Sequence, residues 1–243
     1  MPGDPPNTPG NRPQDVASSS AEGDGPNIFM RVLIATVPLA LIVFCLLPNA
    51  GPVFRSFYAA SSAMAPTLPA GTFMLVSRIS YGYCRHSFDW FDLPLAGRWP
   101  DIMPKRGDIV AVRAPSDTGT VYIERVIGLP GDTVQMIQGR LWLNGVLVPR
   151  EAAVAIADPL DPAKLSATHI EHLPGAPPYR ILEGEGDEGP LDTTPSYKVP
   201  TRHLFVMGDN RDNSADSRLM DRLGYVPLDL VIGRVVFSMG APR

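Results

Sequence analysis

The chain begins with a polar segment and continues with a long apolar one. Residues 1–27 are rich in proline, glycine and small polar residues, with almost nothing to bury, and are predicted to form a disordered tail. The apolar run Ile28–Leu47 would be about 30 Å long as a helix, which matches the hydrocarbon thickness of a bilayer. We therefore expect a transmembrane helix over residues 28–48, with Pro48 ending it. A buried core helix is the alternative.

Beyond this run, the apolar positions fall in short segments rich in β-branched and aromatic residues. Gly and Pro turns such as Leu129–Asp132 separate them, and Arg140–Val148 contains Asn144-Gly145, a strong two-residue hairpin signal. No long helical period is present, so the pattern predicts a mostly β, antiparallel domain over residues 55–240. The expected strands, besides this hairpin, are Phe73–Ser77, Asp108–Arg113, Val121–Gly128, Thr133–Ile137 and Leu230–Phe237.

One part of this domain lacks the β pattern. Residues 151–201 contain eight prolines, several acidic residues and little periodicity. We expect an irregular excursion that makes few contacts with the core.

The stretch Leu204–Arg218 begins with four apolar residues and continues with a dense run of polar ones. Its acidic, basic and amide side chains stand at short spacing, which favours a loop that is hydrogen-bonded within itself and positions other residues. An ordinary solvated turn is the alternative. A calcium loop through Asp212, Ser214 and Asp216 is a weaker one, because the sharp-turn glycine and the distal glutamate of an EF-hand are missing.

Composition and charge narrow the class of protein. With 243 residues, 44% of them hydrophobic, the chain can bury a core, and a net charge of −4 without a basic cluster argues against nucleic acid as a partner. Cys45 lies within the apolar run and Cys84 outside it, so we do not expect them to pair. The four histidines show no zinc spacing and no glycine-rich phosphate loop is present, so neither a metal nor another cofactor is expected.

Several segments, in this order, resemble bacterial signal peptidase I, the membrane-anchored serine endopeptidase that removes signal peptides from exported proteins. The likeness covers roughly residues 28–240. The segments are Ser61–Leu68 with Gly71, Lys105–Val110, Tyr122–Asp132, Leu204–Arg218, Gly224–Pro227 and Val231–Arg234.

The resemblance implies a single-pass protein of the bacterial cytoplasmic (inner) membrane, with its β domain on the outer, periplasmic side. It also implies a hydrophobic groove that docks an extended signal peptide by main-chain pairing. The implied partners are signal peptides, membrane lipid and, as a further candidate, the export machinery.

The family's chemistry needs a serine nucleophile and a lysine that acts as its base, and this sequence has neither at the matching positions. The nucleophile position holds Ala63 and the base position holds Glu124. A methyl group cannot attack a peptide bond. Burial on the face shared with Tyr122 and Val126 would keep Glu124 protonated, as a hydrogen-bond donor.

Two neighbouring serines are the fallback nucleophiles. Ser62 is one residue away from the nucleophile position, and a shift of one residue in an extended segment turns a side chain to the opposite face. Ser61 matches a position at which some relatives hold a serine that stabilises the oxyanion, so hydrogen bonding is its expected role.

Other positions match the family's supporting frame and groove. By resemblance, Asp216 and Arg218 form a buried ion pair, and Ser214 faces Glu124 in place of the lysine. The supporting residues are taken to be Asp209, Asn210, Arg211, Ser214, Asp216 and Arg218, and the substrate-binding residues Met64, Pro66, Leu68, Tyr122 and Ile123. Plain core packing is an equal alternative for the apolar members of the second set.

Three hypotheses follow for the function. The favoured one is a membrane-anchored signal peptidase I family protein of the export pathway that has lost peptidase chemistry and binds extended signal peptides. The second is an active signal peptidase I that uses Ser62 or Ser61. The third is a structural membrane protein that binds no peptide.

Overall fold

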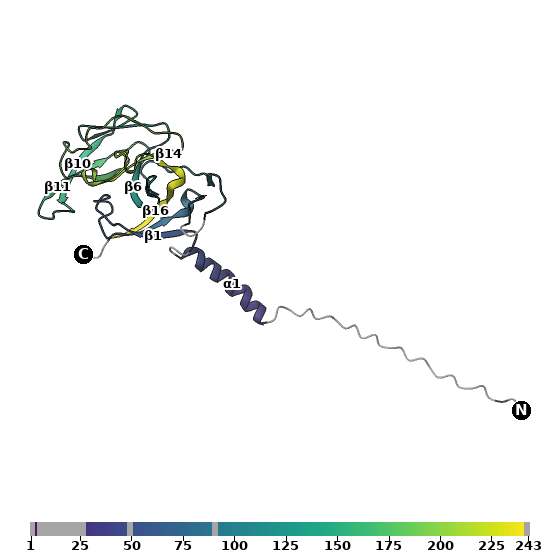
Figure 1. The fold of residues 1–243 in the computed structure, drawn as a ribbon. Helices are drawn as coiled ribbons and strands as arrows, with labels where there is room; N and C mark the ends of the chain where they lie inside the picture. The colour runs from purple at the N-terminus through teal and green to yellow at the C-terminus, as the bar shows by residue number, and fades with distance from the viewer. Residues whose placement is uncertain (1–2, 4–27, 48–50, 89–91, 241–243) are drawn as a thin grey trace. The chain divides into compact units, whose positions relative to one another are not determined.

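The computed structural model describes residues 3, 28–47, 51–88 and 92–240 (Figure 1). The chain divides into two compact units, residues 1–41 and 42–243. Apart from residue 3, the predicted disordered tail lies outside the described residues.

The apolar run forms helix α1, Ile28–Leu46. Its described apolar side chains are mostly exposed, among them Leu33, Leu39 and Ile42. Within the described ranges, however, no helix is both long and apolar enough to cross a bilayer. The helix is therefore confirmed, and the membrane span predicted over residues 28–48 is not.

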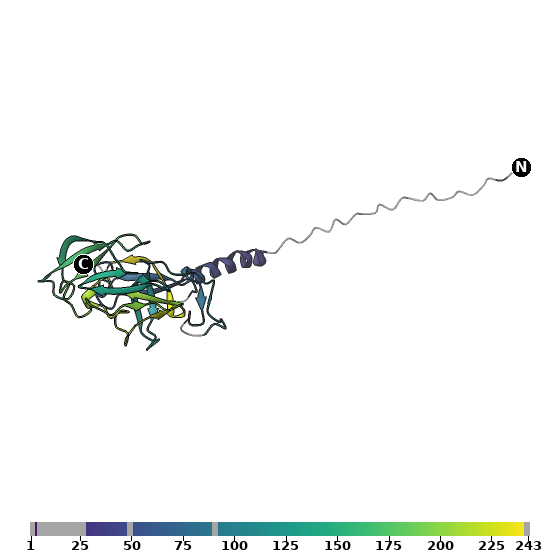
Figure 2. The same cartoon turned by 90° about the horizontal axis from the view of Figure 1, so that it is seen from above.

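The predicted antiparallel β domain is confirmed, and its largest sheet has seven strands in the order β1-β2-β16-β5-β6-β14-β15. The C-terminal strand β16 lies between β2 and β5, so the yellow strand in Figures 1 and 2 runs among the blue strands from the start of the domain. The bounds are β1 Phe54–Tyr58, β2 Phe73–Ser77, β5 Ile109–Arg113, β6 Val121–Gly128, β14 His203–Met207, β15 Val226–Pro227 and β16 Val231–Met239.

Smaller sheets complete the described part of the domain. One has the order β13-β7-β8-β9, another β10-β11-β12, and β3 pairs with β4. The hairpin predicted at Asn144-Gly145 joins β8 to β9, and both turn residues have positive φ, 54° and 77°. The bounds are β3 Tyr83–Cys84, β4 Arg98–Trp99, β7 Thr133–Ile137, β8 Arg140–Leu143, β9 Val146–Leu147, β10 Arg150–Ala157, β11 Leu165–Glu171, β12 Tyr179–Glu183 and β13 Tyr197–Lys198.

The expectation of an irregular excursion over residues 151–201 is wrong. This segment supplies most of the β10-β11-β12 sheet as well as β13. In β11 the buried positions include Ser166, Thr168 and Glu171. Because these buried residues are polar, the alternation in burial produces no alternation in hydrophobicity, which is the signal on which the prediction relied.

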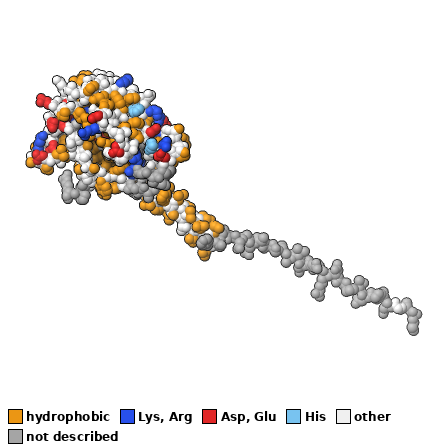
Figure 3. Space-filling model, in the orientation of Figure 1, with side chains coloured by type: hydrophobic (Ala, Val, Ile, Leu, Met, Phe, Trp, Pro, Cys, Tyr) orange, Lys and Arg blue, Asp and Glu red, His pale blue; other side chains and the backbone are white. Residues whose placement is uncertain are grey.

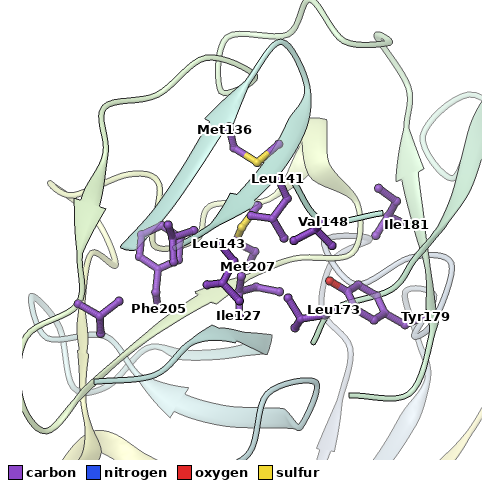
Figure 4. Close-up of a cluster of buried hydrophobic side chains, with 12 residues drawn as sticks. Ile127, Met136, Leu141, Leu143, Val148, Leu173, Tyr179, Ile181, Phe205 and Met207 are labelled. Carbon is purple, nitrogen blue, oxygen red and sulfur yellow. The ribbon is translucent and has the colours of Figure 1, made fainter. Parts of the chain in front are cut away.

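The same segment also contributes to the core. One buried cluster joins β14 residues such as Phe205 and Met207 to Leu173, Tyr179 and Ile181 from the segment (Figure 4). The expectation of few core contacts is therefore also wrong. On the outside, acidic and basic side chains are interspersed over the face seen in Figure 3.

Candidate functional site

A groove of about 670 Å³ lies at one side of the seven-stranded sheet. It is open to solvent and mostly apolar. Its walls come from the end of β1 and the segment after it, from β6, and from the loop that follows β14. The lining residues are Phe57 to Ser61, Ala63, Met64, Leu68, Thr120 to Glu124, Pro190, Leu191, Asp212 to Ala215, Leu219 and Arg222.

Ala63 lines this groove and is held through its backbone. Its carbonyl oxygen accepts a hydrogen bond from the Asn210 amide at 2.9 Å, and the Asn210 side chain donates to the Ser62 carbonyl at 3.2 Å. Asn210 thus fixes the segment that presents Ala63, which was expected of a supporting residue.

Glu124 lies at the bottom of the groove, on β6 opposite Val110, and is 1% exposed. Ser214 Oγ donates a long hydrogen bond, 3.5 Å, to Glu124 Oε2. Burial, reinforced by the negative charges of Asp216 and Asp209, raises the pKa of Glu124 well above its ordinary value. This shift is in the direction that favours the protonated form, which the sequence also predicts.

The two fallback serines lie differently. Ser61 is exposed, lines the groove, and its Oγ accepts a hydrogen bond from the Ala63 amide at 3.4 Å. Ser62 is 5% exposed, is absent from the groove lining, and its Oγ accepts a hydrogen bond from Asn213 Nδ2 at 2.9 Å. Ser62 is therefore turned away from the groove, as expected, but the reason differs, because residues 61–67 form turns and not an extended segment.

The Gly208–Arg218 loop is buried and braced, which excludes the solvated turn. Arg218 binds Asp216 through two hydrogen bonds of 2.8 and 2.9 Å and also donates to the Arg211 carbonyl. Asp216 accepts a further hydrogen bond from the Gly208 amide at 3.1 Å. The alternative of a calcium loop is also wrong. Two of its three expected ligands have other partners, because Asp216 binds Arg218 and Ser214 binds Glu124.

Two of the loop's side chains are braced from outside it. Asp209 accepts two hydrogen bonds from Arg125 on β6 and one from Thr67. Arg211 forms an ion pair with Glu171 on β11. Arg125 and Glu171 are not among the predicted supporting residues, and no local spacing reveals them, because Arg125 precedes its partner Asp209 by 84 residues.

The predicted substrate-binding residues divide into two groups. Tyr122 and Ile123 line the groove and are partly buried, whereas Met64 and Leu68 line it while being 3% and 2% exposed. Both of the latter pack against Met74 in the core, so they belong to groove and core at once. Pro66 is not among the lining residues.

The groove also has members that the sequence analysis missed. Phe57 and Tyr58 come from β1, while Leu219 and Arg222 come from the turns after Arg218. These residues line one groove only because the fold brings β1 and the segment after β14 together, which the sequence pattern does not show.

Comparisons with known proteins agree on one family. The family described as "Signal peptidase, peptidase S26" matches residues 29–239. Signal peptidase I of Pseudomonas aeruginosa is 31% identical over 201 residues, which cover 79% of this chain and 67% of that protein. Signal peptidase I of Pseudomonas fluorescens is 34% identical over 207 residues, which cover 79% of this chain and 67% of that protein. Signal peptidase I of Rickettsia typhi is 33% identical over 198 residues, which cover 76% of this chain and 71% of that protein.

Proposed function

Because the chain belongs to the signal peptidase (peptidase S26) family, we propose that its groove binds signal peptides of exported proteins and that it has lost the family's peptidase activity. The observation that carries this proposal is the pair of side chains at the reaction centre. By the family resemblance, Ala63 stands at the nucleophile position and Glu124 at the base position.

Neither side chain supports the reaction. The methyl group of Ala63 cannot form an acyl-enzyme, and loss of a nucleophile typically costs on the order of 10⁶ in turnover, about 8 kcal/mol at the transition state. Burial raises the pKa of Glu124, which favours the protonated carboxyl, and a protonated carboxyl is no base for a hydroxyl. Among the described residues that line the groove there is no lysine or histidine to replace it.

The serines beside Ala63 do not restore the chemistry. Ser62 points away from the groove and is held by Asn213. Ser61 reaches the groove, but the described lining offers it no neutral amine or imidazole as a base. An active signal peptidase I that uses either serine is therefore the less favoured function.

Peptide binding, in contrast, is supported by the shape and chemistry of the groove. β1 is at the edge of the seven-stranded sheet and its end lines the groove, and such an edge is where an extended peptide can add by main-chain pairing. Several of the residues after β1 that line the groove, Ala59, Ala60 and Ala63 among them, are small and leave room for side chains of the peptide. Mostly apolar walls suit the apolar stretch of a signal peptide.

We place this function at the outer, periplasmic face of the bacterial cytoplasmic membrane, with α1 in contact with lipid. Family membership and the exposed apolar side chains of α1 support this location. Recovery of the full chain in the membrane fraction after a carbonate wash, and its release when residues 28–47 are deleted, would test it.

The decisive experiment is cleavage of a preprotein with an Ala-x-Ala site in detergent. The unaltered chain is compared with Ala63→Ser, Glu124→Lys and the double variant, and binding of a labelled signal peptide is measured on each. We expect every protein to bind the peptide and only the double variant to cut.

Steady cleavage by the unaltered chain would contradict the proposal that peptidase activity has been lost. In that case the variant with Ser61 and Ser62 both replaced by alanine shows whether either serine is the nucleophile. No peptide binding by the folded, unaltered chain would instead favour the structural membrane protein. Thermal unfolding of each variant confirms that its domain is intact.

A further inference from the structure

A cluster of three carboxylates lies beside the groove, and the function proposed above gives their charges no role. Glu183 ends β12, Asp192 lies between β12 and β13, and Asp212 belongs to the short helix η2, Arg211–Asn213. One carboxylate oxygen from each lies within 4.8 Å of the other two. Three segments of chain thus bring three negative charges to one point.

The cluster contains buried oxygens that no donor satisfies. Glu183 and Asp192 are 1% and 2% exposed, and in the described part of the chain both oxygens of Glu183 and Oδ1 of Asp192 have no hydrogen-bond partner. Leaving a buried carboxylate oxygen unpaired is costly, so such groups are normally paired or bound to a cation.

A nearby arginine does not supply the missing partner. Arg150 Nη1 lies 3.7 Å from Glu183 Oε1, beyond hydrogen-bonding distance. This guanidinium instead donates to the Gly139 carbonyl at 2.9 Å and to Asp187 at 2.8 Å. Arg150 therefore forms a long ion pair with Glu183 but no hydrogen bond, and both Glu183 oxygens stay without a hydrogen-bond partner among the described residues.

Other contacts hold the carboxylates in place. Asp192 Oδ2 accepts the Gly189 amide and Asp212 Oδ2 accepts the Glu185 amide, each at 2.7 Å. The turn comes close to the cluster at Gly189, where an added Cβ would lie 2.8 Å from Asp212 Oδ1 and 3.1 Å from Asp192 Oδ2. The backbone thus orients two of the three ligands and leaves the unpaired oxygens free.

We propose that Glu183, Asp192 and Asp212 bind a Ca²⁺ ion, which holds the 184–192 segment against the loop that carries Asp212. Carboxylate oxygens are the ligands that hard divalent cations prefer. Ca²⁺ accepts several protein oxygens in flexible geometry, whereas Mg²⁺ usually keeps several waters and is held by only one or two carboxylates. Water and backbone carbonyls would complete the coordination.

The ion would stabilise one wall of the groove. Asp212 lines the groove, and so do Pro190 and Leu191, the two residues before Asp192. Joining Asp192 to Asp212 through a cation would fix these walls relative to each other. The proposal does not depend on peptide binding or on peptidase activity.

A proton shared among the carboxylates is the alternative to a bound cation, because it would also reduce their mutual repulsion. Burial, reinforced by Asp212 and Asp192, raises the pKa of Glu183 to about 8. Without an ion, a proton would therefore occupy Glu183 at neutral pH. The experiment must separate these two ways of removing the charge.

The test measures Ca²⁺ binding directly on the full chain in detergent at neutral pH. After treatment with EDTA and its removal, CaCl₂ is titrated calorimetrically, and thermal unfolding is followed with CaCl₂, MgCl₂ or NaCl at equal ionic strength. For a dissociation constant of about 10⁻⁴–10⁻³ M, about 5 mM Ca²⁺ should raise Tm by about 3–8 °C.

Matched variants assign the effect to the cluster. Glu183→Gln and Asp192→Asn should each abolish the Ca²⁺-dependent rise, whereas Glu188→Gln should keep it, because Glu188 is exposed in the same segment and loses the same charge. Absence of saturable Ca²⁺ binding to the unaltered chain would overturn the proposal in favour of the shared proton, even if a variant fails to fold. The proposal would also be overturned if Mg²⁺ raised Tm as much as Ca²⁺ does, or if the Ca²⁺-dependent rise in Tm persisted in both cluster variants.

Discussion

Arg211 and Glu171 form a bidentate ion pair whose side chains are 0% and 1% exposed, with N–O distances of 2.9 and 2.6 Å. The pair connects the loop beside the groove to β11, in a segment that the sequence pattern describes as irregular. Tyr179 donates a further hydrogen bond to Glu171 at 2.7 Å. The loop is therefore held from the neighbouring sheet as well as from within.

Breaking this pair should destabilise the domain strongly. Glu171→Gln leaves the Arg211 charge buried without its counter-charge, so we expect the free energy of unfolding to fall by about 3–5 kcal/mol. Urea unfolding at pH 7 measures the change. Glu188→Gln, an exposed change of the same kind, should stay within about 0.5 kcal/mol. A loss below about 1 kcal/mol for Glu171→Gln would contradict the role of the pair.

The same pair makes stability sensitive to acid. Burial by itself would raise the pKa of Glu171, but the charge and hydrogen bonds of Arg211 and the hydrogen bond of Tyr179 outweigh it and hold the pKa below its ordinary value of 4.5. The stabilisation is complete above the unfolded pKa and is lost as pH falls through the lower, folded pKa. Unfolding measured from pH 6 down to pH 3 should show the destabilisation of Glu171→Gln shrinking with acid. A constant difference would contradict this assignment.

Glu124 should have the opposite pH dependence. Its folded pKa is raised, so the folded state keeps a proton that the unfolded state loses above about pH 4.5. Stability of the unaltered chain should therefore decline from that pH up to the folded pKa, relative to Glu124→Gln, by about 1.4 kcal/mol per pH unit. Urea unfolding from pH 5 to pH 8 measures the two proteins in parallel. If their difference does not change with pH, Glu124 is not protonated in the fold.

Filling the groove should block peptide binding without unfolding the domain. Ala63 is half-buried and lines the groove, so Ala63→Phe places a ring where the peptide would lie. We expect the affinity for a labelled signal peptide to fall at least about tenfold, which is about 1.4 kcal/mol. Ala155→Phe adds the same ring at an exposed position of β10 and should leave the affinity unchanged. Equal affinity in both variants would place the binding site elsewhere.

Gly233 should tolerate no side chain. It lies in β16 beside β2, and an added Cβ would fall 2.2 Å from the Ser77 carbonyl oxygen, where only a shift of the backbone relieves the overlap. Gly233→Ala should lower the free energy of unfolding by about 2–3 kcal/mol. Gly240→Ala is the matched control, because an added Cβ there meets nothing within 4 Å. Similar stability of the two variants would show that β16 and β2 separate easily.

The sequence by itself determined the local elements and part of the groove. Short segments rich in β-branched and aromatic residues, bounded by turn residues, placed β2, β6 and β7 at their observed bounds, and Asn144-Gly145 placed a hairpin, because both signals arise from neighbouring residues. Alternation also put Glu124 in the interior. These features depend only on which face of a strand a residue occupies.

Only the tertiary structure decided which distant residues meet. The insertion of β16 between β2 and β5 and the pairing of Arg211 with Glu171 depend on the path of the whole chain. The spacing of residues along the sequence does not reveal either of these contacts. In β11 the buried faces of the strand are polar and are satisfied by partners from other segments, such as Arg211 and Val154. Where hydrogen bonds and charge rather than apolar area stabilise the interior, a pattern of hydrophobic residues does not reveal the fold.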